Sequence, residues 1–406
     1  NINFIYLNGD IMNKKICTLL LILIFTFSFN FSYANSTSLD INARSYIVID
    51  RKSKKVIIGK NEYNKVKMAS TTKIMTATVV LEHCNLNDTV IISKKAASTG
   101  GSRLGLKLND KITVTDLLYG LLLCSGNDAA VALAEYTSGS IPAFCDLMNK
   151  KAKELNLNNS HFETPHGLDS DGHYTTAYEL ALMADNALQN DLFRKIVGTK
   201  HHTILINSIP KDLNNTNELL GVLNGVYGIK TGFTNGANRC LVTGCKRDDM
   251  DIICVVLGCD TRNFRSQDST KLINYCFDNY DYINVENKLI DKLNCWKAEN
   301  TNYFKILKST NSNLNITYEK FDNPNIPVLK SETNSITINL SFKQNLQAPV
   351  EPGTIVGSYE ICAPTQILQS GNIISTNTIY KKHIFTYFKD FIINYSNILN
   401  TSLGRI

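Results

Sequence analysis

The sequence predicts an α/β (α+β) sandwich, in which an antiparallel sheet is flanked by helices. Three observations support this fold class. An apolar hairpin pattern stands near residue 45, helical runs follow it, and alternation of period two returns from Gly228 onward. Because the early hairpin and the late strands can complete one sheet with the helices between them, we place this domain at residues 40–284.

Each element of this domain follows from a local pattern. The hairpin RSYIVIDRKSKKVIIGKN places two apolar runs around a polar turn. The late strands are GIKTGF, NRCLVTGCK and MDIICVVLGC, and a last helix follows in QDSTKLINYCFDNY. Apolar residues at three-and-four spacing predict the intervening helices at Thr71–His83, Thr115–Tyr136, Pro142–Leu155 and Thr176–Leu188.

The composition of the chain changes after residue 284. Residues 285–376 are rich in Asn and Thr and alternate as in SITINLSF and TIVGSYEIC, which predicts a small β-rich domain without a helix. Residues 377–406 predict a C-terminal amphipathic helix with flanking lysines. We expect it either to lie on a membrane surface or to pack on its own domain. Its apolar stripe consists of Ile384, Phe388, Phe391, Tyr395, Ile398 and Leu399.

The first residues have the pattern of an export signal. Met12 precedes two lysines and the apolar run ICTLLLILIFTFSF, and small residues stand at Ser32 and Ala34. This pattern is typical of a secretory signal peptide, which we place at residues 1–34. A membrane helix needs a longer apolar span. We interpret residues 1–11 as a start-site artefact.

Composition argues against several classes of function. The net charge of +6 is small for this length and no dense basic block occurs, so nucleic-acid binding is not indicated. The eleven cysteines are scattered through apolar runs of a chain too large to need disulfides, which predicts buried free thiols. His173, His201 and His202 have no cysteine or carboxylate at metal-ligand spacing. We therefore expect no metal and no cofactor.

A serine and a lysine stand three residues apart in NKVKMASTTKIMTATVVLE. On a helix this spacing brings Ser70 and Lys73 to one face, so that the amine can reach the hydroxyl. Ser208 and Lys211 have the same spacing, but a proline lies between them and no helical run follows. The spacing alone therefore favours a helix cap and a solvated lysine over a catalytic pair.

Two further motifs accompany this pair. The SGN at residues 125–127 interrupts the apolar helical region LLLCSGNDAAVALAE. Because buried polar groups need partners, it indicates the wall of a cleft. The KTG at residues 230–232 lies on a predicted strand, and its glycine indicates close approach by another backbone.

In this order the three motifs resemble those of the D-alanyl-D-alanine carboxypeptidases, the low-molecular-mass penicillin-binding proteins of the S11 peptidase type. The similarity extends over residues 43–279, including ELNLNNSHFETPHGLDSDGHYTTAYELALMADNAL and GIKTGFTNGANRCLVTGCKRDDMDIICVVLG. It implies a fold of the penicillin-binding protein/β-lactamase type. The β-rich segment and the tail also look like that family's second domain and membrane anchor.

The resemblance implies that the enzyme removes the last D-alanine from peptidoglycan stem pentapeptides at the outer face of a bacterial membrane, with β-lactams as inhibitors. Ser70 would be acylated. A lysine acts as a base only when neutral, and both Lys230 and desolvation would disfavour a charge on Lys73. Lys73 is then the general base, and Ser125 would relay a proton to the departing D-alanine.

Binding roles follow from the same resemblance. Backbone N–H groups of Ser70 and Phe233 would form an oxyanion hole, and Asn127 would hold the substrate's amide. Arg265 and Thr231 would bind the terminal carboxylate while the peptide lies extended beside the KTG strand. The substrate-binding set is Asn127, Lys230, Thr231, Gly232, Phe233, Arg265 and His166.

Some roles stay open at this point. Arg262 is the alternative to Arg265, and His166 is either catalytic or orders its loop through a hydrogen bond. The chain also departs from the family at two positions. Asn238 replaces a usual glycine, a mild change because asparagine tolerates left-handed backbone. Cys124 precedes the SGN motif, as an oxidation-sensitive or an inert thiol.

Two alternative functions share these motifs. A class A β-lactamase needs a glutamate that activates the deacylating water. Glu154 in KELNLNN is the candidate, but it ends an amphipathic helix, so a structural role is favoured. A catalytically silent wall-binding or β-lactam-sensing module is the other alternative, and the intact motif set argues against it.

Overall fold

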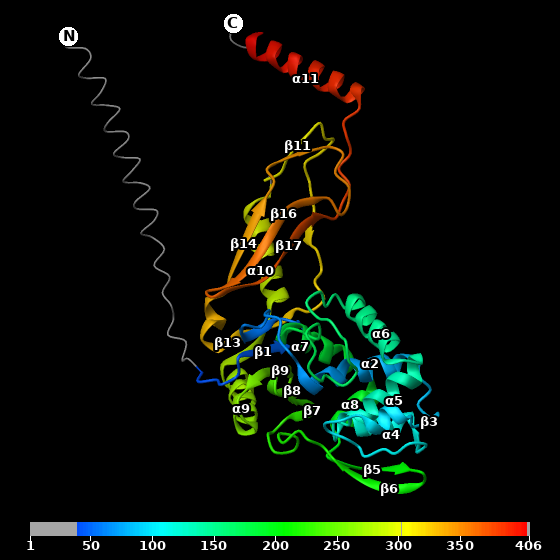
Figure 1. Ribbon diagram of the computed structural model, residues 1–406. Helices are drawn as coiled ribbons and strands as arrows, with labels where there is room; N and C mark the ends of the chain where they lie inside the picture. The colour runs from blue at the N-terminus through cyan, green and yellow to red at the C-terminus, as the bar shows by residue number, and fades with distance from the viewer. Residues whose placement is uncertain (1–38, 302, 404–406) are drawn as a thin grey trace, which may run out of the picture. The chain divides into compact units, whose positions relative to one another are not determined.

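The computed structural model describes residues 39–301 and 303–403 (Figure 1). The predicted signal peptide and start-site artefact therefore lie outside the described residues. Two separate apolar cores occur in the described part. The first is built from residues between Ile47 and Leu257, and the second from residues between Val285 and Ile379.

The first core lies against a five-stranded antiparallel sheet in the order β2-β1-β9-β8-β7. The early hairpin and the late strands thus share one sheet, and the predicted fold class is confirmed. Strand β7 ends the sheet, with β8 on one side. The strands are β1 (Ser45–Asp50), β2 (Val56–Lys60), β7 (Val226–Thr234), β8 (Asn238–Arg247) and β9 (Met250–Cys259).

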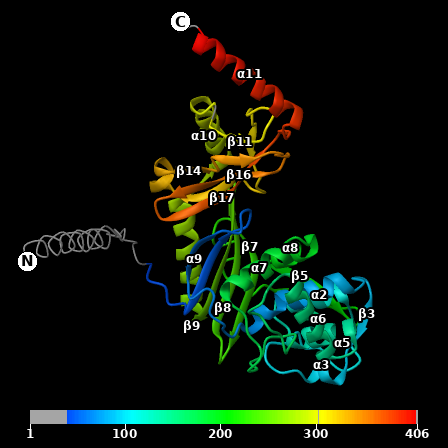
Figure 2. The same ribbon diagram turned by 90° about the horizontal axis from the view of Figure 1, so that it is seen from above.

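Helices cover both faces of this sheet (Figure 2). Helix α9 (Arg262–Asn279) lies on one face, against β8 and β9, and α7 (Ala177–Ala187) lies on the other, together with α2 (Lys73–His83). The further helices are α3 (Lys94–Ser98), α4 (Val114–Leu122), α5 (Asn127–Ser138), α6 (Ile141–Glu154) and α8 (Asp191–Val197). β3 (Thr89–Ile91) and β4 (Lys111–Thr113) form a two-stranded antiparallel pair, and β5 (His201–Ile206) and β6 (Ile209–Asn214) form a hairpin.

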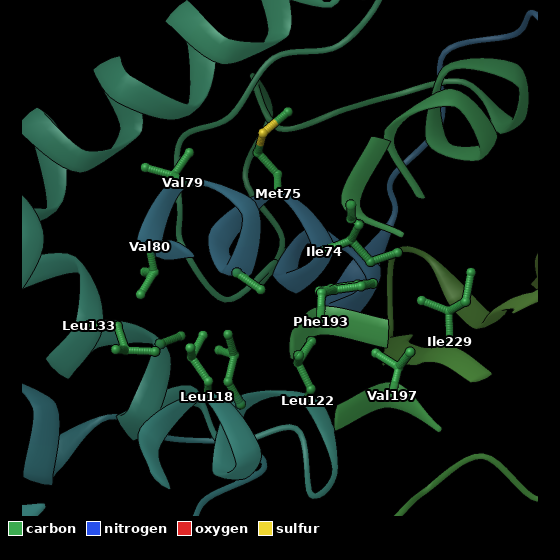
Figure 3. Packing of buried hydrophobic residues seen from close by; sticks show 14 of the residues in the cluster. Ile74, Met75, Val79, Val80, Leu118, Leu122, Leu133, Phe193, Val197 and Ile229 are labelled. Carbon is green, nitrogen blue, oxygen red and sulfur yellow. The ribbon is translucent and has the colours of Figure 1, made fainter. Parts of the chain in front are cut away.

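Helix α2 is the centre of the first core. Its first eight residues are all buried, so it is surrounded by other elements rather than lying with one face in water. Figure 3 shows Val80 and Ile74 on the side of α2 that faces Leu133, Leu118 and Phe193, whereas Met75 and Val79 point to its opposite side. This packing fixes the N-terminus of α2, where Lys73 stands. The labelled residues are Ile74, Met75, Val79, Val80, Leu118, Leu122, Leu133, Phe193, Val197 and Ile229.

Two predicted helices differ in detail from the observed ones. The run predicted at Thr71–His83 begins with a 3-10 turn, η1 (Ala69–Thr72), before α2. The run predicted at Thr115–Tyr136 is divided between α4 and α5. The division falls at Ser125, whose φ of 63° is left-handed and incompatible with a continuous helix. The polar interruption in the sequence therefore marks a real break in the backbone.

The second core belongs to a β-rich region that also contains a helix. Its four-stranded sheet has the order β12-β17-β16-β14. Helix α10 (Val285–Glu299) shows that the prediction of no helix within residues 285–376 is wrong. Val285, Leu289 and Leu293 form a buried stripe at spacing four, and Asn284 caps the helix. The surrounding Asn-rich sequence obscured that stripe.

The strands of the second region range in length from three to ten residues. The sheet consists of β12 (Ile316–Tyr318), β14 (Thr337–Phe342), β16 (Ile355–Ala363) and β17 (Gln366–Ser375). Two-stranded pairs join β10 (Tyr280–Asn284) to β13 (Asn325–Leu329) and β11 (Lys305–Leu307) to β15 (Asn345–Gln347), and a 3-10 turn, η2, covers Lys330–Ser335.

The predicted C-terminal helix is present as α11 (Ile384–Leu403). Several of its apolar side chains are exposed, including Phe385, Phe388 and Phe391. Among the residues in view, no helix combines the length and the apolar character needed to cross a membrane.

Candidate active site

A cleft of about 210 Å³ lies where β7, η1 and the α4–α5 break meet. It brings together residues from all three sequence motifs, which are more than 150 positions apart at their extremes. Its lining consists of Ser70, Ser102, Cys124, Ser125, Thr216, Thr231, Gly232, Phe233, Arg239, Arg262 and Arg265.

Ser70 and Lys73 are in hydrogen-bond contact, with 2.8 Å between Lys73 Nζ and Ser70 Oγ. Ser70 belongs to η1, and Lys73 is the first residue of α2. Ala69, just before the serine, has a left-handed φ of 49°. Such backbone conformations are uncommon for a residue with a side chain and occur often at functional sites.

Lys73 is completely buried and has no carboxylate among its hydrogen-bond partners in the described structure. Besides Ser70, its Nζ contacts Asn127 Oδ1 at 2.7 Å and the carbonyl oxygen of His166 at 2.8 Å. Burial first, and then the charge of Lys230, lower the pKa of Lys73 well below the usual lysine value. A neutral amine fits these contacts, because it can donate to the two carbonyl oxygens and accept the serine proton.

The SGN motif forms the wall opposite β7. Ser125 is nearly buried and lines the cleft. Asn127 begins α5, and its two side-chain ends are both engaged, with Oδ1 accepting from Lys73 and Nδ2 donating to the carbonyl oxygen of Gly100 at 2.8 Å. Asn127 therefore holds Lys73 in place in this structure.

The KTG motif lies on the edge strand β7. Lys230 is buried, and burial lowers its pKa to about 7, aided by the charge of Arg265. Thr231 Oγ1 is 2.7 Å from Thr216 Oγ1. A Cβ on Gly232 would lie 3.2 Å from both Ala69 Cβ and the Met68 carbonyl oxygen. The close approach inferred from this glycine is thus to the backbone preceding Ser70.

Both arginines weighed from the sequence bind one acidic residue, Glu218. The Nη2 of Arg265 lies 2.7 Å from each carboxylate oxygen of Glu218, and Arg262 also forms an ion pair with it. Their exposure separates them, because the side chain of Arg265 is 4% exposed and that of Arg262 is 64% exposed. The Nε of Arg265 is buried without a hydrogen-bond partner.

The loop that carries His166 is fastened beside the nucleophile. The carbonyl oxygen of His166 accepts from Lys73, and its ring Nδ1 accepts from the Leu168 N–H at 3.2 Å. This second bond is the loop-ordering contact considered as one alternative for His166. A Cβ on Gly167, whose φ is +85°, would lie 1.9 Å from the Ala69 carbonyl oxygen, so no side chain fits there.

Three important residues were missed by the sequence interpretation. Glu218 is one. His173 was considered only as a metal ligand, yet it is buried and lies 2.8 Å from Thr72 Oγ1, two residues from Ser70. Asp128 is buried and accepts backbone N–H groups from residues 104–106. Asp128 directly follows the SGN motif, and a charged residue inside an apolar run was a signal that could have pointed to it.

The sequence analysis also singled out Asn238, Cys124 and Glu154. Asn238 has a left-handed φ of 56°, as expected for the position. The Cys124 thiol donates to the carbonyl oxygen of Gly120, and burial raises its pKa, which favours the inert form. The side chain of Glu154 is 50% exposed, pairs with Lys151 and does not line the cleft.

The sequence predicts buried free thiols and no metal site. All ten cysteines of the described residues are free, and six of them are buried, whereas Cys295 is exposed. The described part of the chain holds no group of three or more His, Cys, Asp or Glu side chains that could bind a metal.

Comparison with known proteins supports the interpretation of the motifs. Residues 32–261 match the family model of the D-alanyl-D-alanine carboxypeptidases. The chain is 33% identical over 356 residues to the D-alanyl-D-alanine carboxypeptidase DacF of Bacillus subtilis, with 86% of this chain and 88% of that protein covered. It is 39% identical over 249 residues to DacC of Escherichia coli, covering 58% and 62%.

Solved structures lead to the same family. The D-alanyl-D-alanine carboxypeptidase DacD of Francisella tularensis matches with a TM-score of 0.68 and 27% identity, covering 85% of this chain and 95% of that one. Penicillin binding protein 5 of Haemophilus influenzae matches with the same TM-score and identity, covering 84% and 98%. The chain belongs to the D-alanyl-D-alanine carboxypeptidase family, peptidase family S11.

Proposed function

We propose that the protein is a serine-type D-Ala-D-Ala carboxypeptidase that forms an acyl-enzyme on Ser70. The observation that carries this proposal is the 2.8 Å contact between Ser70 Oγ and the fully buried amine of Lys73. Family membership supplies the reaction class, and this contact supplies a nucleophile with its base.

In the first step, neutral Lys73 takes the proton of Ser70 while Oγ attacks the carbonyl carbon between the two D-alanines. The developing oxyanion is held by the backbone N–H groups of Ser70 and Phe233, a contribution of about 3 kcal/mol per donor in comparable sites. The peptide C–N bond then breaks, and the departing nitrogen receives a proton through Ser125. Water hydrolyses the ester and regenerates the free serine.

The substrate lies extended beside β7. This proposal is supported by the sheet order, because β7 has β8 on one side only and an edge strand can pair with a peptide backbone. Thr231 and Arg265 bind the terminal carboxylate, and the position of both residues in the lining of the cleft supports this assignment. Lys230 contributes positive charge at this end, and Asn127 exchanges its bond with Lys73 for one with the substrate's amide.

The site of action is the cell wall, at the outer face of the bacterial cytoplasmic membrane. The signal-like segment supports export, and the flanked apolar stripe of α11 supports contact with a membrane surface rather than a crossing. β-Lactams inhibit the enzyme because they acylate the same serine and the acyl group is released slowly. We place the catalytic domain at residues 40–284, the β-rich domain at residues 285–376 and the tail at residues 377–406.

The test is mass spectrometry of a stem pentapeptide incubated with the wild type, with Ser70→Ala and with Ser208→Ala. Ser208 is a matched control, because it stands in the other Ser/Lys pair and is exposed. We expect the wild type and Ser208→Ala to release D-alanine and Ser70→Ala to release none. Release by Ser70→Ala would refute the assigned nucleophile.

The same proteins, incubated with a fluorescent penicillin and nitrocefin, test the alternatives. A long-lived label on the wild type supports a carboxypeptidase. Rapid nitrocefin turnover would instead indicate a β-lactamase. Binding of wall peptides with neither D-alanine release nor label would indicate a silent module.

A further inference from the structure

One end of the cleft carries more positive charge than a terminal carboxylate needs. Arg239, Arg262 and Arg265 all line it. Glu218 contacts Arg262 and Arg265, so one negative charge is shared by two of the three guanidinium groups. Among the described residues Arg239 forms no ion pair. The substrate proposed above brings a single carboxylate, which leaves one guanidinium group without a counter-charge.

Arg239 is held in a fixed position without an acidic partner. It lies on β8 directly opposite Phe233 on β7. Its guanidinium carbon is 3.6 Å from the centroid of the Phe233 ring, and that ring is 46% exposed. A guanidinium group that stacks through its flat face keeps the N–H groups of its edge for a ligand, and their fork geometry suits a carboxylate.

The charge of Arg239 belongs to the end of the cleft from which the leaving group departs. Burial, followed by the charges of Arg265 and Arg262, lowers the pKa of Arg239, and Glu218 opposes this effect. Its electrostatic neighbours are therefore the groups around the terminal carboxylate. The guanidinium group still remains charged, because arginine titrates far above neutral pH.

We propose that Arg239 is a second carboxylate-binding residue of the leaving-group subsite, and that the enzyme accepts an acidic D-amino acid such as D-glutamate in place of the last D-alanine. Arg265 binds the α-carboxylate of that residue and Arg239 its side-chain carboxylate. This inference rests on the proposed function. The acyl-enzyme and its hydrolysis are unchanged, and the amino acid released is D-glutamate.

The experiment compares three diacetyl-L-lysyl-D-alanyl peptides that end in D-alanine, D-glutamine or D-glutamate. D-Glutamine matches D-glutamate in size and lacks the charge. We expect the wild type to have a kcat/KM about tenfold higher for the D-glutamate peptide than for the D-glutamine peptide, the effect of one charge-assisted contact. We expect this ratio to fall to about one in Arg239→Gln and to an intermediate value in Arg239→Lys, which keeps the charge without the fork.

Lys246→Gln is the matched control. Lys246 is an exposed cation on the same strand and does not line the cleft, so this variant loses the same net charge elsewhere. Its ratio should equal that of the wild type. A lower ratio in Lys246→Gln would show that overall charge, not Arg239, sets the preference.

The outcomes separate this inference from the proposed function. A wild-type ratio near one, with D-alanine still released from the D-alanine peptide, would overturn the role of Arg239 alone. Failure to release any of the three residues would overturn both. A further comparison uses two penicillins that differ by a carboxylate on the acyl side chain. If Arg239→Gln changes their relative acylation rates and leaves the peptide ratio unchanged, Arg239 acts on the acyl side and the leaving-group assignment is wrong.

Discussion

The two ends of the cleft use cations in opposite ways. At one end Lys73 is buried without a carboxylate contact, and its amine is driven toward the neutral form. At the other end Arg265 is almost as buried, yet it is paired with Glu218 and stays charged. The comparison teaches that burial alone does not decide what a basic residue does. Whether a carboxylate is buried with the side chain, and how far its ordinary pKa lies above neutrality, decide how readily it loses its charge.

The largest expected effect comes from removing the base at the lysine end. Lys73→Met keeps most of the side-chain length in a buried site and removes the proposed proton acceptor of Ser70. We expect the rate of acylation by a fluorescent penicillin to fall by about 10³-fold, within the range for a lost general base. Lys150→Met, an exposed lysine of α6, is the control. Near-wild-type acylation by Lys73→Met would mean that another group activates Ser70.

The second prediction separates the two arginines that share Glu218. Glu218→Ala leaves the buried guanidinium of Arg265 without its carboxylate, and we expect a loss of about 3 kcal/mol in the free energy of unfolding. Arg262→Gln removes a largely exposed partner and should cost less than about 1 kcal/mol. Urea unfolding of both variants measures the difference. Equal losses would show that Arg265 is not the buried member of the pair in solution.

The third prediction concerns acid. Burial lowers the pKa of His173 to about 4, whereas an unfolded chain would have a value near 6.5. The unfolded state therefore binds more protons between these values, and stability falls as pH drops below about 6.5, by up to about 1.4 kcal/mol per unit for this group. Its ring fits the neutral form, since Nδ1 accepts from the Glu163 N–H and Nε2 faces Thr72.

His173→Gln should reduce this pH dependence. Urea midpoints at pH 7 and pH 5 provide the measurement, with the wild type expected to lose about 2 kcal/mol more than the variant between these two pH values. Burial also lowers the pKa of His166, to about 3. His166 therefore contributes to the loss of stability in acid in both the wild type and His173→Gln. An unchanged slope in His173→Gln would exclude His173 as a source of the acid sensitivity.

The smallest expected effect tests the link between the two lysines. Lys230→Met removes a positive charge that lowers the pKa of Lys73, so the pH at which acylation is half-maximal should rise. We expect a modest shift, because burial is the first cause of the lowered pKa and is unchanged in the variant. The pH profile of acylation by a fluorescent penicillin is the readout. A downward shift would contradict the assumed repulsion.

Much of the fold was predictable because its signals are local. The hairpin of β1 and β2, the late strands and most helices follow from apolar spacing, and the break at Ser125 follows from a polar interruption. Helix α10 was missed because its stripe of Val285, Leu289 and Leu293 is thin and lies in an Asn-rich segment. Three apolar residues at helical spacing were too few to indicate a helix within so polar a segment.

The sequence by itself determined which groups could react, since Ser70, Lys73 and the SGN and KTG motifs are recognisable from residue type and order. Only the tertiary structure decided which cations are buried without a carboxylate contact and which are paired with one. The pairing of Arg265 with Glu218, and the contact of Lys73 with Asn127 and the His166 carbonyl, join positions 47, 54 and 93 residues apart in the chain. Burial and electrostatic fields depend on distances in space, and a pattern of neighbours along the chain does not contain those distances.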